Sequence, residues 1–98
     1  MRFTRHVEFD IQPGKEKQYR STFDNEVVPV MKKQKGFKGE LALLDEKNHA
    51  IGISLWENRE SAEQYRTSTY PQVLEKLQPV IKGSPTVETY EVATSTLN

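Results

Sequence analysis

The sequence contains no cysteine, which excludes disulfide bonds, catalytic thiolates and cysteine-ligated metal sites. It also lacks an excess of either charge, because 14 lysine and arginine residues balance 14 aspartate and glutamate residues. Nucleic-acid-binding domains usually carry a clustered basic surface, so this balance argues against such a partner. No apolar run approaches membrane-spanning length, and the first ten residues lack the apolar core of a signal peptide. We therefore expect a cytoplasmic protein with no nucleic-acid or membrane partner.

RNA-binding signals are also missing where the sequence comes closest to them. The segment KGFKGELAL, residues 35–43, begins like the signature of the RRM fold. Gly39 and Ala42 then stand where that signature has aromatic residues, and the side chains that stack on bases are absent. We therefore interpret the glycines structurally, with Gly36 as a left-handed helix cap and Gly39 as the site of a bend or bulge.

Hydrophobic periodicity predicts four strands and two helices in one domain, residues 1–98. Residues 3–11 alternate between apolar and polar side chains, which predicts a strand. An apolar stripe at helical spacing then runs from Tyr19 to Met31, and two strands follow around a polar turn at residues 46–48. A second stripe extends from Ala62 to Ile81, and a last alternating run from Thr86 to Ala93 predicts the fourth strand. We expect residues 94–98 to fray.

Local signals predict where the helices start and break. Pro29 should kink the first helix or loosen its last turn. Asn58 is a suitable N-cap for a second helix that begins near Arg59. Residues 68–71 should divide that helix in two, because Pro71 is tolerated only in a first turn.

The resulting order, βαββαβ, is the ferredoxin-like α+β arrangement, with helices on one face of a four-stranded antiparallel sheet. The two middle strands are apolar on both faces. We assign one set to the helix side: Leu41, Leu43, Ile51, Ile53 and Leu55. The other set then faces outward: Ala42, Leu44, Ala50 and Trp56. Since a solvated face should be polar, we expect a second copy of the chain to pack on it, sheet against sheet.

Four stretches of the chain together resemble a known family. They are PGK after the first strand, KGFKG before the second, SLWENRESAEQY at the start of the second helix, and YEV in the last strand. This pattern is similar to that of the antibiotic biosynthesis monooxygenase-like family, over roughly residues 3–92. The resemblance implies a homodimer whose two sheets form a dimeric α+β barrel. Some family members oxidise quinol or polyphenol substrates with molecular oxygen and no cofactor, others degrade haem, and many have no known activity.

The resemblance does not favour haem degradation or a metal site. Haem-degrading members use an asparagine, a tryptophan and a histidine at positions that correspond here to Val7, Tyr65 and Glu75. None of the three residues is retained, and a glutamate cannot supply a neutral imidazole to iron. We therefore expect no haem, no metal and no other cofactor.

His6 and Tyr65 are the candidate catalytic residues. Cofactor-free oxygenation requires an apolar pocket for an electron-rich aromatic molecule and a group that favours its deprotonated form. Histidine suits that proton transfer because its ordinary pKa is near neutrality. His6 lies on the first strand, opposite in parity to Phe3, and the favoured alternative is a hydrogen-bonded histidine in the dimer interface. Tyr65 matches the family's pocket-facing helix position and retains a ring and a hydroxyl, although an ordinary core tyrosine fits equally well.

Arg5, Trp56 and Tyr70 are the candidate substrate-binding residues. Arg5 shares the parity of Phe3, so its guanidinium either binds an anionic substrate under the helices or reaches back to solvent, which we favour. Trp56 precedes the second helix and fits packing or a dimer contact better than a binding role. Tyr70 lies at the expected helix break, where a pocket entrance could form, and a surface tyrosine is the favoured alternative. His49, beside the hairpin turn, is expected to face solvent.

Two functions remain open. The first is a cofactor-independent monooxygenase for a small quinol- or polyphenol-type aromatic, which predicts a cavity of a few hundred cubic ångströms near Tyr65, reached by His6 or Arg5. The second is a non-catalytic dimeric domain of the same fold that binds a small ligand or is associated with stress. That function predicts a filled core in which polar groups pair with one another.

Overall fold

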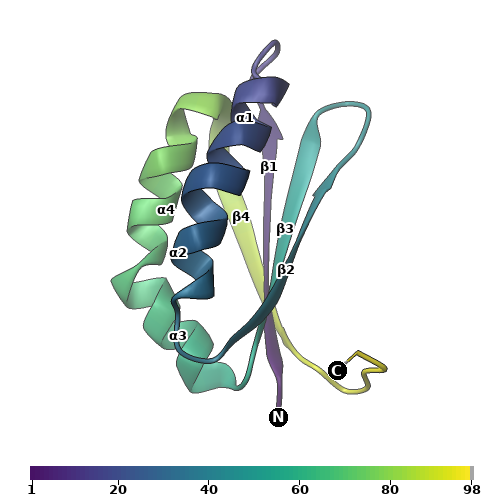
Figure 1. Cartoon of the computed structure of the whole chain (residues 1–98). Helices are drawn as coiled ribbons and strands as arrows, with labels where there is room; N and C mark the ends of the chain where they lie inside the picture. Colours follow the sequence, from purple (N-terminus) through teal and green to yellow (C-terminus); the bar gives the residue numbers. More distant parts are fainter. Residues whose placement is uncertain (98) are drawn as a thin grey trace.

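A computed structural model describes residues 1–97 of the chain as one layer of helices packed on one sheet (Figure 1). The strands are β1 (Phe3–Ile11), β2 (Phe37–Leu44), β3 (His49–Trp56) and β4 (Ile81–Glu91). The α-helices are α1 (Glu16–Thr22), α2 (Val28–Lys32), α3 (Arg59–Ser68) and α4 (Tyr70–Leu77). A π-helical segment, η1 (Phe23–Val27), joins α1 to α2, and a short 3-10 segment, η2 (Gln78–Val80), follows α4. This order confirms the predicted ferredoxin-like fold.

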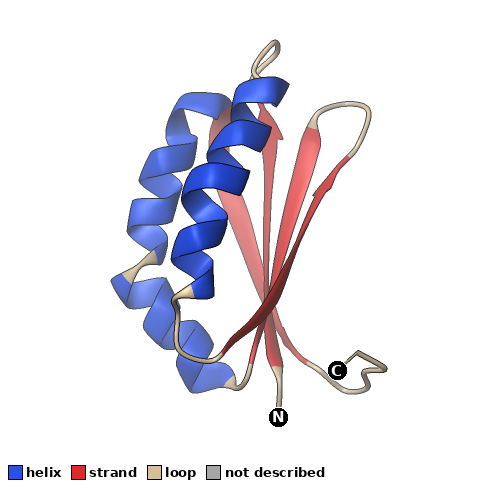
Figure 2. Cartoon of the chain, viewed as in Figure 1, coloured by secondary structure: helices blue, strands red, loops and turns tan. Residues whose placement is uncertain are grey.

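The four strands form one antiparallel sheet in the order β2-β3-β1-β4. Within residues 1–97, all helices cover the same face of this sheet, and the other face carries no helix (Figure 2). We call this uncovered surface the open face. Its presence in a chain this short agrees with the expectation that one subunit cannot cover both surfaces.

Several local signals in the sequence have the predicted effect. Asn48 adopts a left-handed φ of 63° in the turn between β2 and β3. The side chain of Asn58 caps α3 by accepting a hydrogen bond from the backbone N–H of Ser61 at 2.9 Å. The second helical region is divided between Ser68 and Tyr70, with Pro71 in the first turn of α4. Each boundary therefore follows from short-range chemistry.

The first helical region is interrupted at the place that its proline predicts. Pro29 is the second residue of α2 and has no N–H to donate to the preceding turn. The π-helical segment η1 lies directly before α2, so the regular α-helical hydrogen-bond pattern changes at that point. Phe23 and Val27, at the two ends of η1, both remain buried.

The two glycines that precede and enter β2 have different roles. Gly36 is left-handed, with φ of 81°, but α2 ends at Lys32, so the prediction that Gly36 caps this helix is wrong. A Cβ atom at Gly36 would lie 2.2 Å from the Oγ atom of Ser61. The glycine therefore allows the connection into β2 to pass directly against α3. Gly39 lies at a register shift between β2 and β3, which confirms the expected bulge.

The sheet faces of β2 and β3 are the reverse of our assignment. Phe3 pairs with Trp56 and Phe9 with Ala50, and all four side chains are buried beneath the helices. The set that we placed outside is therefore under the helices: Ala42, Leu44, Ala50 and Trp56. The open face instead carries Leu41, Leu43, Ile51, Ile53 and Leu55. The prediction of two apolar faces holds, because the two sets have simply exchanged places.

The last strand begins earlier than predicted. We assigned Ile81 to the apolar stripe of the second helix, whereas it is the first residue of β4 and pairs with Ile11. The register between β1 and β4 shifts at a bulge, where Glu8 pairs with Thr86 and Asp10 pairs with Lys82. Residues 94–97 form no helix or strand, and residue 98, part of the tail that we expect to fray, lies outside the described residues.

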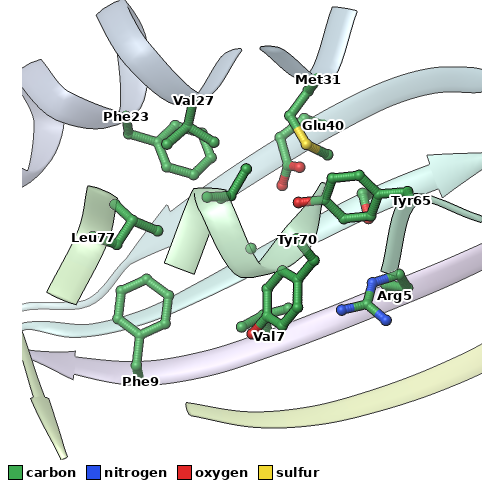
Figure 3. A pocket seen from close by; sticks show the side chains of 13 residues that line it. Arg5, Val7, Phe9, Phe23, Val27, Met31, Glu40, Tyr65, Tyr70 and Leu77 are labelled. Carbon is green, nitrogen blue, oxygen red and sulfur yellow. The ribbon is translucent and has the colours of Figure 1, made fainter. Parts of the chain in front are cut away.

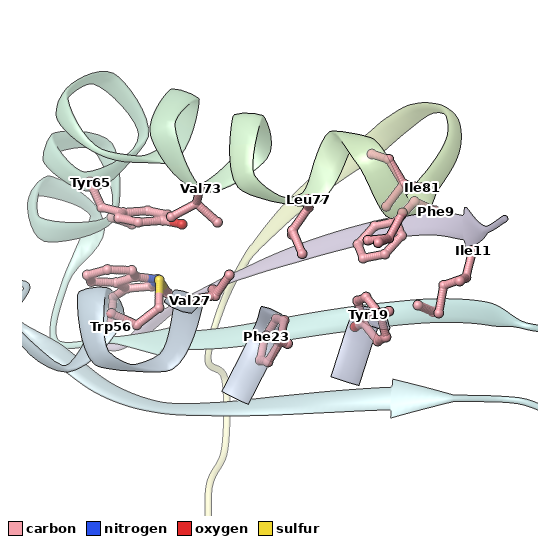
Figure 4. Close-up of a cluster of buried hydrophobic side chains, with 14 of the residues drawn as sticks. Phe9, Ile11, Tyr19, Phe23, Val27, Trp56, Tyr65, Val73, Leu77 and Ile81 are labelled. Atoms are coloured by element: carbon pink, nitrogen blue, oxygen red, sulfur yellow. The ribbon is translucent and has the colours of Figure 1, made fainter. Parts of the chain in front are cut away.

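The core lies between the sheet and the helices (Figure 4). Trp56 is fully buried, and its ring stacks on that of Tyr65 with centroids 4.9 Å apart. At the other end of the layer, the rings of Phe9 and Tyr19 meet edge to face at 5.7 Å. The polar residues described next lie between these two aromatic groups.

Candidate functional site

Arg5 lies in β1 beneath the helices and is only 2% exposed. Within residues 1–97 it forms no ion pair with an acidic side chain, and its Nη2 atom has no hydrogen-bond partner. Burial lowers the pKa of Arg5, yet a guanidinium remains charged at any pH at which the protein is folded. The expectation that this side chain reaches solvent is therefore wrong. The protein holds a buried cation without an anion.

Two tyrosine rings enclose this guanidinium. Its Cζ atom lies 4.7 Å from the ring centroid of Tyr70 and 5.6 Å from that of Tyr65. A desolvated cation–π contact contributes about 2 kcal/mol. Removing a charge from water costs several kcal/mol, so the rings offset only part of that cost. A negatively charged ligand beside Arg5 would offset the remainder.

A cavity of about 40 Å³ lies next to Arg5, between the sheet and the helices (Figure 3). Its polar lining residues are Arg5, Glu40, Ser54, Tyr65 and Tyr70. Its other lining residues are Val7, Phe9, Phe23, Val27, Met31, Gly52, Val73 and Leu77. One water molecule needs about 10–15 Å³ of such cavity volume. The space therefore accommodates a few water-sized molecules. A pocket of about 240 Å³ also adjoins Tyr65, beside Gln34 and Ser61, but Arg5 does not line it. A volume of a few hundred cubic ångströms is therefore present next to Tyr65 but not beside Arg5.

Glu40 is the site residue that sequence reasoning missed. Its carboxyl group forms no hydrogen bond or ion pair within the described chain, and burial raises its pKa to about 8. The signal was present in β2, where Glu40 has the same parity as Ala42 and Leu44. A carboxyl group in register with small and apolar residues indicates a buried acid. We did not recognise it because we assigned that parity to the outer face.

The structure does not bring His6 and Tyr65 together. His6 lies on the open face, where its Nε2 atom is 3.1 Å from the Oγ1 atom of Thr4 and its ring meets Tyr90 edge to face at 4.9 Å. Tyr65 lies on α3, on the other side of the sheet. A single small substrate in the cavity therefore contacts Tyr65 and Arg5 but not His6.

Trp56 has the packing role that the sequence favours, and Tyr70 lines the cavity at the expected helix break. Trp56 does not line the cavity: it lies behind Tyr65, and its Nε1 atom donates a hydrogen bond to the Oγ atom of Ser54 at 2.8 Å. Trp56 therefore contributes to the site by holding Tyr65 and Ser54 in place. Tyr70 lines the cavity as the first residue of α4, next to the helix break, and the favoured alternative of a surface tyrosine is wrong.

His49 has partners that the sequence did not suggest. Its Nδ1 atom lies 2.9 Å from Asp10 and its Nε2 atom 3.5 Å from Glu8, all on the open face. The hydrogen bond with Asp10 is the main reason that the pKa of His49 is raised. This group is solvent-accessible and remote from the cavity, so it does not form part of the candidate site.

We expect the burial of Glu40 to make the protein less stable as pH rises. Below its ordinary pKa of 4.5 the carboxyl is protonated in both the folded and the unfolded state. Between 4.5 and about 8 only the unfolded state releases the proton, so the free energy of unfolding falls by at most about 1.4 kcal/mol per pH unit. Partial solvent access reduces this slope.

Urea unfolding of the wild type and of Glu40→Gln between pH 5 and 8 measures the effect. His49, whose pKa is raised, contributes a slope of the same sign as pH rises, but both proteins retain it. The carboxylates with lowered pKa values titrate below this range: Glu16, Asp45 and Glu63. The wild type should therefore lose more stability than the variant. Parallel curves would show that Glu40 titrates normally.

Neither a metal cluster nor a membrane span is found in residues 1–97. No group of three or more histidine, cysteine, aspartate or glutamate side chains in that part of the chain is arranged to hold a metal ion. None of the helices within the same residues combines the length and apolar character needed to cross a membrane.

Several solved structures share this fold at low sequence identity. A Nitrosomonas europaea protein of unknown function, NE2512, has a TM-score of 0.82 at 12% identity and covers 99% of this chain and 94% of its own. SnoaB, a cofactor-independent oxygenase from Streptomyces nogalater, has a TM-score of 0.80 at 12% identity, with 99% and 98% covered. Rv0793 from Mycobacterium tuberculosis has a TM-score of 0.78 at 11% identity, with 99% and 100% covered. These similarities show a common fold. No curated protein sequence matches the chain.

A family model matches most of the chain directly. The model describes antibiotic biosynthesis monooxygenase and aligns with residues 2–77, which include β1 to β3, all four α-helices, and the cavity-lining residues. The match agrees with the resemblance inferred from the sequence motifs. The chain belongs to the antibiotic biosynthesis monooxygenase family.

Proposed function

We propose that this protein is a cofactor-independent monooxygenase that binds a small quinol- or polyphenol-type aromatic as its anion against Arg5. The supporting observation is the buried guanidinium without an anionic partner. The family match and the description of SnoaB as a cofactor-independent oxygenase are consistent with this activity. In such a reaction the deprotonated aromatic reacts with molecular oxygen. One oxygen atom enters the substrate, the other leaves as water, and the substrate supplies the electrons.

An aromatic substrate requires the cavity to widen beyond about 40 Å³. The junction between α3 and α4 is suited to such a movement, because helical hydrogen bonding changes at Thr69 and Tyr70 follows immediately. A shift of the Tyr70 ring would open the space beside Arg5. In this proposal Tyr65 orients the substrate with its hydroxyl, and Tyr70 covers it.

We further propose that two copies of the chain pair through their open faces. Leu41 and Leu43 are 58% and 45% exposed there, and Ile53 lies between Leu41 and His6 in neighbouring strands. A dimer would bury these side chains and enclose His6 in the interface, where its contacts with Thr4 and Tyr90 suit a structural role.

A non-catalytic dimeric module that binds a small ligand is the second candidate function. The observation that favours it is the small cavity, which accommodates a few water-sized molecules and not an aromatic ring without rearrangement. In that case Arg5 would bind a small inorganic or organic anion and no oxygen would be consumed.

Replacing Arg5 by methionine is expected to abolish turnover without unfolding the protein. With a panel of quinols under oxygen, we expect kcat/KM to fall at least about 10²-fold, because the developing anion loses its counter-ion. The melting temperature should stay the same or rise, since a buried unpaired charge is replaced by an apolar chain. Oxygen uptake and thermal melts measure the two effects.

The surface variant Arg20→Met removes the same charge from an exposed position and serves as the control. Tyr65→Phe should raise KM if the hydroxyl orients the substrate. Full turnover in Arg5→Met would rule out the proposed role of the guanidinium. Binding of phenols by the wild type without oxygen uptake would favour the second candidate function.

A further inference from the structure

The cavity has a basic and an acidic group on different strands. Arg5 comes from β1 and Glu40 from β2, and Tyr65 of α3 interacts electrostatically with both (Figure 3). Arg5 and Glu40 form no ion pair with each other. A buried cation and a partly buried acid that do not neutralise each other are each available to a ligand between them.

The chain leaves space in front of the carboxyl group. Position 52, on the neighbouring strand β3, is a glycine, and a Cβ atom there would lie 3.4 Å from the Oε2 atom of Glu40. A larger side chain would occupy the part of the cavity next to the carboxyl. Because Gly52 has no side chain, the Glu40 carboxyl faces the same space as the Arg5 guanidinium.

We propose that Glu40 accepts the proton that the substrate loses, while Arg5 holds the resulting anion. This inference rests on the proposed function and adds a catalytic residue and a substrate class to it. In the step, the O–H bond of the substrate breaks and its electron pair stays on the substrate oxygen. The proton forms a new O–H bond with the Glu40 carboxylate. No electron transfer occurs in this step, and each charge in the cavity is then neutralised.

The environment of Glu40 suits a proton acceptor. Burial raises its pKa to about 8, so it is a much stronger base than an ordinary carboxylate and still ionises near neutral pH. Tyr19 on α1 and Tyr65 on α3 lie close enough to Glu40 to interact with its charge, and Arg5 on β1 and Tyr70 on α4 line the same cavity. Burial lowers the pKa of Arg5 and raises those of the three tyrosines, to about 12 for Tyr19. Within the described cavity lining, Glu40 is thus the group that changes charge between pH 6 and about 9.

A cavity that contains both Arg5 and Glu40 favours ligands that are weak acids over ligands that are permanent anions. A phenol or quinol arrives neutral, because its ordinary pKa is near 10, and becomes an anion only by giving its proton to Glu40. A carboxylate ligand is already charged, and beside ionised Glu40 it would place two negative charges against one guanidinium. The substrate class is therefore a neutral aromatic or enolic hydroxyl compound.

Opposite pH trends in binding test the proposal without any turnover. Phenol and benzoate are titrated into the wild type, in the absence of oxygen, from pH 6 to 9. Phenol should bind more tightly as pH rises through about 8, while benzoate should bind about tenfold more weakly per pH unit above it. Both trends should disappear in Glu40→Gln, which has nearly the same size and leaves no hydrogen bond broken. Parallel trends, or trends retained in the variant, would overturn the assignment.

Kinetics with a quinol that the wild type oxidises provide the second test. We expect kcat of Glu40→Gln to fall about 10²-fold or more with little change in KM, and the rise in activity near pH 8 to be lost. Glu40→Asp should retain that rise at a lower rate. Glu75→Gln, which removes a carboxylate from the exposed surface of α4, should behave as the wild type.

The failure of this inference is distinguishable from the failure of the proposed function. Wild-type kinetics in Glu40→Gln would overturn the role of Glu40 and leave the oxygenase intact. Opposite binding trends without oxygen uptake by the wild type would overturn the oxygenase and support proton acceptance by Glu40. If neither phenol nor benzoate binds, both are wrong.

Discussion

Gly36→Ala is expected to reduce the free energy of unfolding by about 3–5 kcal/mol, enough to unfold much of a small domain. Two costs combine at this position. The backbone is left-handed, with φ of 81°, which costs a residue with a Cβ atom about 1–2 kcal/mol. The new Cβ would also lie 2.2 Å from the Oγ and 2.6 Å from the Cβ of Ser61, so α3 must move away from the connection into β2.

Gly14→Ala separates these two costs. Gly14 has the same φ of 81°, but a Cβ atom added there would meet nothing within 4 Å, so this variant should lose only the backbone cost of about 1–2 kcal/mol. Adding Ser61→Gly to Gly36→Ala should recover part of the loss, because both clashing atoms are removed. Urea unfolding monitored by circular dichroism measures all four proteins. Equal losses in Gly36→Ala and Gly14→Ala would show that the contact with Ser61 is easily relieved.

Ile53→Glu is expected to convert a dimer into a monomer. Ile53 lies in β3 on the open face, opposite His6 on one side and Leu41 on the other. A glutamate there would be enclosed between two sheets with no lysine or arginine paired to it, at a cost of several kcal/mol. The dimer should therefore weaken by at least about 10³-fold in Kd. Sedimentation at micromolar concentrations distinguishes the two states.

Two variants control this result. Gln72→Glu adds the same charge on α4, which covers the opposite side of the sheet, and Ile53→Leu keeps the position apolar. Both should remain dimers, and all three variants should melt cooperatively, because Ile53 does not belong to the core beneath the helices. A wild-type protein that sediments as a monomer, or an Ile53→Glu variant that sediments as a dimer, would refute pairing through the open face.

The buried arginine and the proposed pairing of subunits both affect the stability of the protein. A site that contains an unpaired guanidinium reduces stability in the absence of ligand. Burial of the open face would supply compensating apolar contacts. A monomeric variant should therefore be less stable as well as unpaired, and activity assays on it should be read together with its melting temperature.

The sequence by itself determined the element order, the turn between β2 and β3 and the N-cap of α3, because these depend on neighbouring residues. Alternation predicted β1, Asn58 predicted the start of α3, and Pro71 predicted the break before α4. It also showed that the middle strands are apolar on both sides. The helix layer on one face follows from the βαββαβ order. The two-sided apolar pattern then predicts an apolar open face, whichever parity lies under the helices.

Only the tertiary structure decided which face is covered, because a shift of one residue in strand pairing exchanges the two faces. The pairing of Phe3 with Trp56 places Glu40 and the Trp56 ring under the helices and leaves Ile53 outside. The lowered pKa of Arg5 and the raised pKa of Glu40 follow from that arrangement. They depend on burial by helices that are far away in the sequence, and no local pattern records that burial.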